Sequence, residues 1–397
     1  MNARRRAGLT FIAALIVATA APATRLLADQ APIKIGIIFS YTGNGATPWG
    51  GRSLDAVIAA FQKTYGDTVA GRKVVIVRRD DTGIAPDVAK RQAQELIVQD
   101  GVDILAGTTV TPNAISVGDV STQSKKPFLV FSAATAGIIA KNPYVSRWGH
   151  TNTQITVPLA KFALKSGLKT AYALFQDYGP GIDAGKTFED TFTAGGGKML
   201  GEVRVPITNV DYSAYVQRVR DVHPQALFVF LNPAGGSAEF LRACKDAGFA
   251  KAGIKILATG EIVEENNLPN IGDAALGVVS GFEYSRVHDS NLNRQFIRAF
   301  NAADTSGDQP DFGDVAEWDA LAAIYRALEA QKGNADPDKL MESIKGMKFE
   351  SPRGPIEIDP QTREITQNVY IRRVERRNGI LANYEIAVYP MVNAAGQ

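Results

Sequence analysis

The chain has 397 residues, with 43 Lys and Arg against 41 Asp and Glu, so its formal net charge is +2. Hydrophobic residues make up 45% and charged residues 21%, which is typical of a folded globular protein and excludes a disordered or fibrous chain. The near-neutral charge argues against a nucleic-acid binder, and the single cysteine, Cys244, excludes an internal disulfide. At about 100–200 residues per domain, the length predicts two domains.

The first 28 residues are predicted to be a secretory signal peptide. Met1–Arg6 is short and basic, residues 9–20 are apolar and rich in alanine, and small residues follow up to Ala28. The apolar run is too short to span a bilayer, which takes about 20 residues. We therefore expect a periplasmic protein, exported by the general or the twin-arginine route and cleaved near Ala28.

Apolar runs typical of buried strands alternate with stretches of helical spacing over most of the chain. The expected strands are 33–39, 74–77, 104–106, 128–131, 171–175, 227–231 and 254–257. The expected helices between them are 51–61, 87–98, 113–123, 153–166, 181–194, 213–221 and 236–247. This alternation predicts parallel sheets built from right-handed βαβ units, and the number of strands favours two α/β lobes over one sheet.

The C-terminal third has a different pattern. Helical spacing recurs at 290–303, 314–331 and 337–346 with little strand between. Beyond residue 355 the apolar residues alternate, which predicts antiparallel strands that close the fold.

Motifs for cofactors and catalysis are incomplete. Residues 43–48 begin like a dinucleotide-binding GxGxxG loop, but Pro48 stands where the third glycine belongs. The Gly-Lys-Thr at 185–187 has Pro180 in place of the first glycine of a P-loop. The three histidines are far apart, at His150, His223 and His288, without metal-binding spacing. We therefore expect no cofactor, no metal and no enzymatic activity.

Polar residues follow the predicted strands at the edge where open α/β sheets bind ligands. Residues 107–114 and 132–135 carry hydroxyls and are each expected to lead into a helix. Two helix N-termini would then form an anion site suited to a carboxylate, although ordinary helix capping explains the same residues. In the second lobe, Glu261 is placed either to accept hydrogen bonds from an ammonium group or to begin a solvated helix.

The order and spacing of these segments resemble the periplasmic solute-binding proteins of branched-chain amino acid ABC importers. These are proteins of the leucine/isoleucine/valine-binding type, with the type I periplasmic-binding-protein fold. The resemblance covers roughly residues 33–389. The stretches that carry it are 35–50, 71–80, 107–114, 133–135, 176–181 and 259–263.

The resemblance implies a set of ligand-binding residues. They are Trp49, Thr111, Ala133, Ala134, Thr135, Tyr178, Asn232 and Glu261. In the family, the segment at 133–135 holds the ligand's carboxylate and ammonium groups, the residue at Thr111 is a carboxylate-binding serine, and the residue at Glu261 pairs with the α-ammonium. Residues at Trp49 and Tyr178 cover the ligand. The family tyrosine expected near Asn232 is missing, and the smaller Pro233 and Ala234 leave room for a bulkier ligand.

The resemblance also implies a function. Lobe 1 would comprise residues 29–149 plus 282–350, and lobe 2 residues 150–281 plus 351–397. The protein would capture a branched-chain or other hydrophobic amino acid in the cleft, close on its hinges, and deliver it to membrane permease subunits. An aromatic or other organic carboxylic acid is the alternative ligand. A secreted enzyme or a sensor partner is the remaining interpretation, and no nucleic-acid partner is expected.

Overall fold

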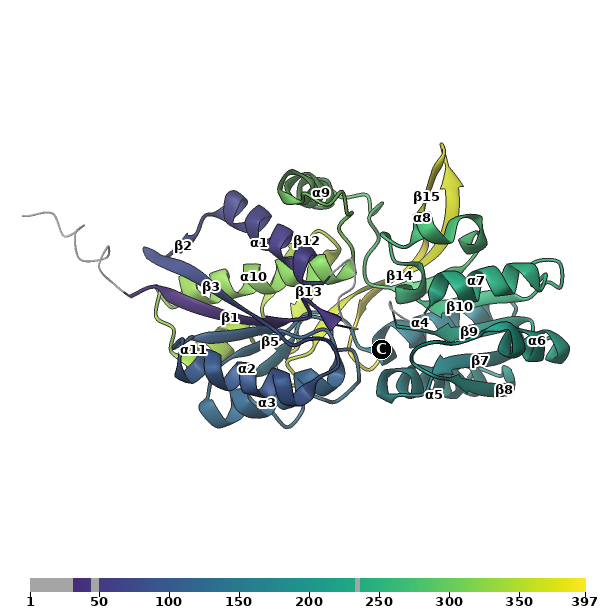
Figure 1. Cartoon of the computed structure of the whole chain (residues 1–397), viewed down its shortest axis with the longest axis horizontal. Helices are drawn as coiled ribbons and strands as arrows, with labels where there is room; N and C mark the ends of the chain where they lie inside the picture. Colours follow the sequence, from purple (N-terminus) through teal and green to yellow (C-terminus); the bar gives the residue numbers. More distant parts are fainter. Residues whose placement is uncertain (1–30, 44–49, 233–235) are drawn as a thin grey trace, which may run out of the picture.

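The computed structural model describes residues 31–43, 50–232 and 236–397. The predicted signal peptide, Trp49, Pro233 and Ala234 lie outside these ranges. The described chain forms two lobes that lie side by side, each built on its own sheet (Figure 1). No helix within the described ranges has both the length and the apolar character needed to cross a bilayer.

The first sheet has the strand order β2-β3-β1-β4-β5-β6, and every neighbouring pair is parallel except β2 with β3. Its strands are β1 (Ile33–Phe39), β2 (Thr68–Val69), β3 (Arg72–Asp80), β4 (Ile104–Gly107), β5 (Phe128–Val130) and β6 (Val145–Arg147). The helices of this lobe are α1 (Gly51–Tyr65), α2 (Pro86–Val98), α3 (Thr111–Ser124), α9 (Asn291–Ala303), α10 (Phe312–Ala330) and α11 (Pro337–Ile344). Figure 1 shows α1 and α10 on one face of the sheet and α2 and α3 on the other.

Strand β1 explains why this sheet is covered on both faces. Ile35 and Ile37 belong to one apolar core, shared with α1 and α10, whereas Ile38 belongs to the core formed with α2 and α3. Gly36 lies against α2, where an added Cβ would come within 2.9 Å of Leu96. A strand buried on both faces needs a continuous apolar run, and the sequence of β1 supplies one.

The second sheet has the order β12-β13-β14-β11-β10-β9-β7-β8, with β15 paired to β14. Its strands are β7 (Thr170–Gln176), β8 (Lys198–Val205), β9 (Ala226–Phe230), β10 (Lys255–Thr259), β11 (Val279–Phe282), β12 (Lys348–Ser351), β13 (Gly354–Ile358), β14 (Ile365–Arg377) and β15 (Ile380–Val392). The strands from β7 to β11 are parallel, and those from β12 to β15 pair in antiparallel fashion. The helices of this part are α4 (Asn152–Lys165), α5 (Gly179–Ala194), α6 (Ser213–Val222), α7 (Ser237–Asp246) and the short α8 (Leu268–Ile271).

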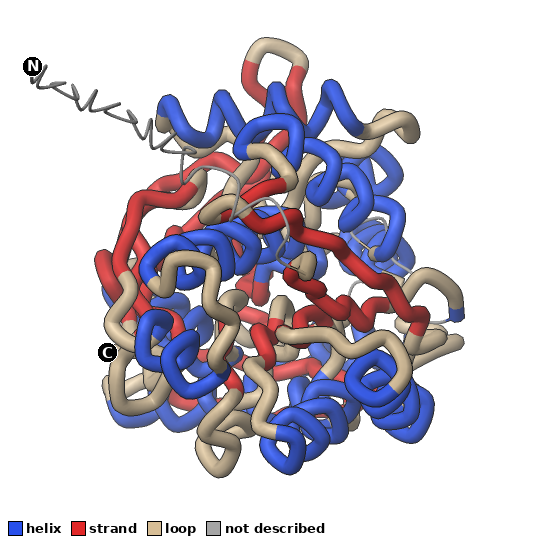
Figure 2. Tube along the Cα trace, turned by 90° about the vertical axis from the view of Figure 1, so that its left-hand side faces the viewer, coloured by secondary structure: helices blue, strands red, loops and turns tan. Residues whose placement is uncertain are grey.

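The predicted fold class, two doubly wound α/β lobes with mainly parallel sheets, is confirmed. Figure 2 shows many of the strands flanked by helices, while one pair of strands projects at the top. The chain passes between the sheets after β6, after β11 and through the strands β12–β14. The assignment of individual residues to each lobe stays a prediction.

One expected element is wrong. The segment after β5 does not lead into a helix; residues 136–144 form turns and the short strand β6 follows. Pro143 restricts the residue before it to extended backbone, and Gly137 has a φ of 75°. The Arg363 guanidinium also donates a hydrogen bond of 3.2 Å to the carbonyl oxygen of Ile139, which would otherwise be an acceptor within a helix. The edge strand β8 was not expected, because it alternates only weakly between buried and exposed residues.

Candidate ligand-binding cleft

The candidate cleft lies where the carboxyl ends of β4 and β5 face the beginning of α5. A Cβ added to Gly179 of α5 would lie 3.9 Å from Oγ1 of Thr135, in the loop after β5. In the same loop, the Ala136 amide donates a hydrogen bond of 3.2 Å to the Asp183 carboxylate of α5. The predicted residue Thr135 is therefore close to the start of α5, which directly follows the predicted residue Tyr178.

The first side of the cleft is formed by hydroxyl and amide groups. The Oγ1 atoms of Thr111 and Thr135 are 3.0 Å apart. Thr111 is the first residue of α3, so it lies at the positive end of the helix dipole. The expected second helix N-terminus is absent here, because the segment after Thr135 forms turns.

The backbone of residues 133–135 is oriented by its carbonyl groups. Arg147 donates to the carbonyls of Ala133, at 2.6 Å, and Thr135, at 2.9 Å, and the Asn152 amide donates to that of Ala134. Within the described ranges, the backbone N–H groups of residues 133–135 have no hydrogen-bond acceptor. Three free N–H groups beside two hydroxyls make a site that fits a carboxylate.

The loop between β4 and α3 holds a strained residue. Gly107 has a φ of 116°, and a Cβ there would come within 2.1 Å of the Ile38 carbonyl oxygen. The next residue, Thr108, is β-branched and has a φ of 64°. Such a conformation costs about 1–3 kcal/mol and persists where the surrounding structure requires it, as at binding sites.

The second side of the cleft combines an aromatic ring with an amide. Tyr178 immediately precedes α5, and its ring centroid is 6.1 Å from that of Phe230. Burial raises the pKa of Tyr178, and the charge of Glu261 raises it further, while a hydrogen bond from Asn232 opposes both. The Tyr178 hydroxyl is thus neutral and lies near both other residues predicted for this side.

Glu261 has a partner that the sequence did not reveal. It lies directly after β10, is 6% exposed, and its Oε1 is 3.3 Å from Nε2 of His150. The other ring nitrogen of His150 is 2.8 Å from Oε1 of Glu283. Within the described ranges, Oε2 of Glu261 has no hydrogen-bond partner, so this oxygen is available to accept from a ligand.

The histidine of this cluster is positively charged at neutral pH. Burial lowers the pKa of His150, but the charge of Glu283 and the contacts with Glu261 outweigh it and raise the pKa to about 9. Burial tends to raise the pKa of Glu283, yet the charge of His150 lowers it below its usual value. The fully buried Arg372 interacts most strongly with Glu265 and Asp311, and less strongly with these two carboxylates. Glu261 and Glu283 therefore already share one buried cation, His150.

Sequence reasoning missed His150 and Arg147 as parts of the site. Arg147 ends β6, and His150 lies shortly after it, in the crossover to α4. What identifies both residues is that they are ionisable yet buried at a connection between the lobes. Burial is known only from the structure, so the sequence alone does not single them out.

The sequence matches the family model of the periplasmic binding proteins over residues 32–379. The chain belongs to this family. It is 37% identical to a Leu/Ile/Val-binding protein homolog 6 of Brucella melitensis, over 90% of this chain and 91% of that one. The predicted resemblance is confirmed, and the family is one of solute-binding proteins, not of enzymes.

Solved structures refine the comparison. A solute-binding protein of an ABC transporter from Rhodopseudomonas palustris BisB5, in complex with 3,4-dihydroxybenzoic acid, is 41% identical with a TM-score of 0.86. A second, from Rhodopseudomonas palustris in complex with 4-hydroxybenzoate, is 38% identical with a TM-score of 0.86. Each match covers 91% of this chain and 98% of the other. This protein is accordingly an ABC-transporter solute-binding protein.

Proposed function

We propose that this protein captures an aromatic carboxylic acid with a ring hydroxyl, of the hydroxybenzoate class, and delivers it to the permease subunits of an ABC importer. It would do so in the periplasm, after removal of residues 1–28. The carboxylate binds the first side of the cleft, at Thr111 and the amides of residues 133–135. The ring lies against Tyr178, and the hydroxyl donates to Glu261.

The observation that carries this proposal is the ion pair between Glu261 and His150. An α-amino acid would place its ammonium group on Glu261, but Oε1 of that carboxylate already lies 3.3 Å from a charged histidine. A ligand ammonium would have to share this carboxylate with a cation that is already present. A phenolic hydroxyl supplies a donor to the free Oε2 without the cost of burying a further ion.

The comparisons support the same ligand class. Two structures that share 38–41% identity with this chain hold hydroxylated benzoates. A third Rhodopseudomonas palustris protein, 25% identical, was solved with benzoate.

An amino acid is the second candidate ligand. It is favoured by the relatives at 37% identity, which are named as homologues of Leu/Ile/Val-binding protein. In this case the ligand's ammonium group would bind the free Oε2 of Glu261. His150, which contacts Oε1, would hold the Glu261 side chain in position.

Ligand capture follows from the two-sided geometry. The ligand docks first through its carboxylate, and the second lobe then closes over the ring. The contact between the Ala136 amide and the Asp183 carboxylate joins the two sides and is expected to form on closure. No covalent bond is made or broken.

A thermal-shift and calorimetry screen of the ligand-stripped protein from residue 29 onwards tests the proposal. The panel contains 4-hydroxybenzoate, 3,4-dihydroxybenzoate, benzoate and leucine. A ligand at about 100 times its Kd adds about 2.7 kcal/mol of stability. We expect the hydroxybenzoates to stabilise most and benzoate less. A response to leucine alone would refute the aromatic ligand and favour the amino acid.

A further inference from the structure

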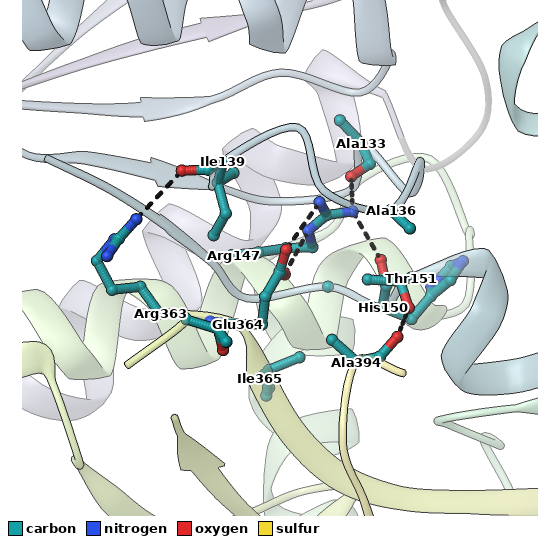
Figure 3. Close-up of polar contacts among 12 residues, drawn as sticks. Ala133, Ala136, Ile139, Arg147, His150, Thr151, Arg363, Glu364, Ile365 and Ala394 are labelled. Atoms are coloured by element: carbon teal, nitrogen blue, oxygen red, sulfur yellow. Dashed lines mark hydrogen bonds and ion pairs between the residues drawn. The ribbon is translucent and has the colours of Figure 1, made fainter. Parts of the chain in front are cut away.

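Arg147 is the most deeply buried charge behind the first side of the cleft. It ends strand β6, and its side chain is 0% exposed. Its guanidinium donates to the carbonyls of Ala133 and Thr135, the two ends of the segment whose amides are free. Figure 3 shows this guanidinium between the loop at Ala133 and the carboxylate of Glu364.

Glu364 connects Arg147 to the last crossover. Its Oε2 is 2.8 Å from Nε of Arg147, and its Oε1 accepts a hydrogen bond of 3.2 Å from the same guanidinium. Burial raises the pKa of Glu364 and the charge of Arg147 opposes this. Glu364 belongs to the turn between β13 and β14, so the ion pair ties the ligand loop to a segment more than 200 residues away in the chain.

The turn between β13 and β14 also contacts the C-terminal end of the loop that begins at Ala133. The Arg147 amide donates to the carbonyl of Arg363 at 3.1 Å. Arg363 in turn donates to the Val145 carbonyl at 3.1 Å. It also donates to the Ile139 carbonyl at 3.2 Å (Figure 3). The loop from residue 133 to residue 145 is therefore fixed at both ends by two arginines and one turn.

The charge of Arg147 also reaches across the cleft. Asp183 of α5 accepts from the Ala136 amide. Burial raises the pKa of Asp183, and the hydrogen bond from Ala136 and the charge of Arg147 both act to lower it. The guanidinium is thus close enough to influence an anion at this face of the loop.

We propose that Arg147 is a positioning residue for the ligand's carboxylate. By holding the Ala133 carbonyl it turns the shared peptide group so that the free amide of Ala134 faces the cleft. By holding the Thr135 carbonyl it orients the amide of Ala136, which donates to Asp183. Its charge favours an anion at this loop without touching it. Glu364 orients the guanidinium and joins the loop to the crossover through β14. This inference rests on the proposed carboxylate site, but it does not depend on which carboxylate the protein binds.

The test compares Arg147→Lys with Arg353→Lys. The planar guanidinium of Arg147 contacts two carbonyls and the Glu364 carboxylate at once. A lysine ammonium is a single point charge and cannot make all of these contacts. Arg353 is a matched control: it is fully buried, pairs with Asp319 at 2.9 Å and donates to the Trp148 carbonyl at 2.6 Å, but it does not contact residues 133–135. Each variant is titrated by calorimetry with 4-hydroxybenzoate and with its neutral amide, 4-hydroxybenzamide, after thermal unfolding has shown that it is folded.

We expect Arg147→Lys to weaken the acid on the order of tenfold, about the effect of one charge-assisted hydrogen bond, and the amide much less. Arg353→Lys should leave the affinity for both compounds within about threefold, well below that loss. Unchanged acid affinity in Arg147→Lys, or equal weakening of acid and amide, would overturn the positioning role. Should the wild type bind leucine instead, the same comparison is made with leucine and leucinamide, so an error in the ligand class is distinguished from an error about Arg147.

Glu364→Gln provides a second variant in case Arg147→Lys does not fold. The amide of glutamine can still orient the guanidinium, while the compensating negative charge is gone. We expect acid affinity to be retained or increased relative to the amide compound. If the affinity for the acid fell more than the affinity for the amide compound, the proposed effect of the Arg147 charge on the ligand's carboxylate would be wrong.

Discussion

The two sides of the cleft present different chemistry. The first side offers neutral donors, the hydroxyls of Thr111 and Thr135 and the free amides of residues 133–135. The second side offers a charged acceptor, Glu261, in a buried network with His150 and Glu283. Because Glu283 directly follows β11 and His150 lies in the crossover after β6, this network also joins two connections between the lobes.

Because of this difference, substitutions on the two sides should affect ligand affinity and the free energy of unfolding to different degrees. A hydroxyl on the first side can be removed without leaving a charge unpaired, so its loss should affect mainly the ligand. A carboxylate on the second side balances a buried cation, so its loss should affect both the ligand and the free energy of unfolding. Each prediction below tests one part of this contrast.

The largest expected effect is on Glu283. Glu283→Ala removes the closest partner of a fully buried, charged histidine. Breaking a buried pair in this way costs about 3–5 kcal/mol in the free energy of unfolding, measured by urea denaturation without ligand. Glu283→Gln, which keeps a hydrogen-bonding group, is the control and should lose less. Equal, small losses in both variants would show that the network is not important for folding.

Stability should also fall at alkaline pH. The pKa of His150 is about 9 in the folded protein against 6.5 ordinarily. Its contribution is therefore complete below about pH 6.5 and is lost as the pH rises through about 9, a change of about 3 kcal/mol. The raised pKa values of Asp311 and Asp314, about 7, act in the same direction but mostly at lower pH.

Urea denaturation between pH 7 and pH 10 measures this effect. The His150→Gln variant supplies the comparison, since it retains the other titrating groups. The difference in unfolding free energy between wild type and variant should shrink with rising pH. A constant difference over this range would contradict a charged His150.

Glu261 distinguishes the candidate ligands. In Glu261→Gln, a phenolic hydroxyl loses a charged acceptor, which is worth about 1.5–3 kcal/mol of binding free energy. Benzoate lacks the hydroxyl and should be affected far less, so the variant should lose its preference for hydroxybenzoates in calorimetric titrations. An amino acid ligand would instead lose about 2–5 kcal/mol with its ammonium partner. Unchanged affinity for all ligands would remove Glu261 from the site.

Local sequence patterns indicate parts of both sides of the site, but not the buried charge pairs behind them. Strand β1 is visible as a local apolar run, and Thr111 as a hydroxyl at a strand–helix junction, because both patterns depend on neighbouring residues. The pair of His150 with Glu283 joins residues 133 positions apart. No local pattern encodes that contact, since it arises only when two crossovers meet in the folded chain. For the same reason, the sequence does not show that His150 lies beside Glu261.

The smallest expected effect is on Thr135. Thr135→Ala removes one hydroxyl from the proposed carboxylate site, while the Thr111 hydroxyl, 3.0 Å away in the wild type, remains to donate. We therefore expect a loss of about 1–1.5 kcal/mol of binding free energy, similar for every carboxylate ligand because all share that group. The unfolding free energy without ligand should change little, in contrast to Glu283→Ala. A loss confined to one ligand would place Thr135 beside the variable part of the ligand, and a large loss of stability would mean that the first side, like the second, is part of the folding core.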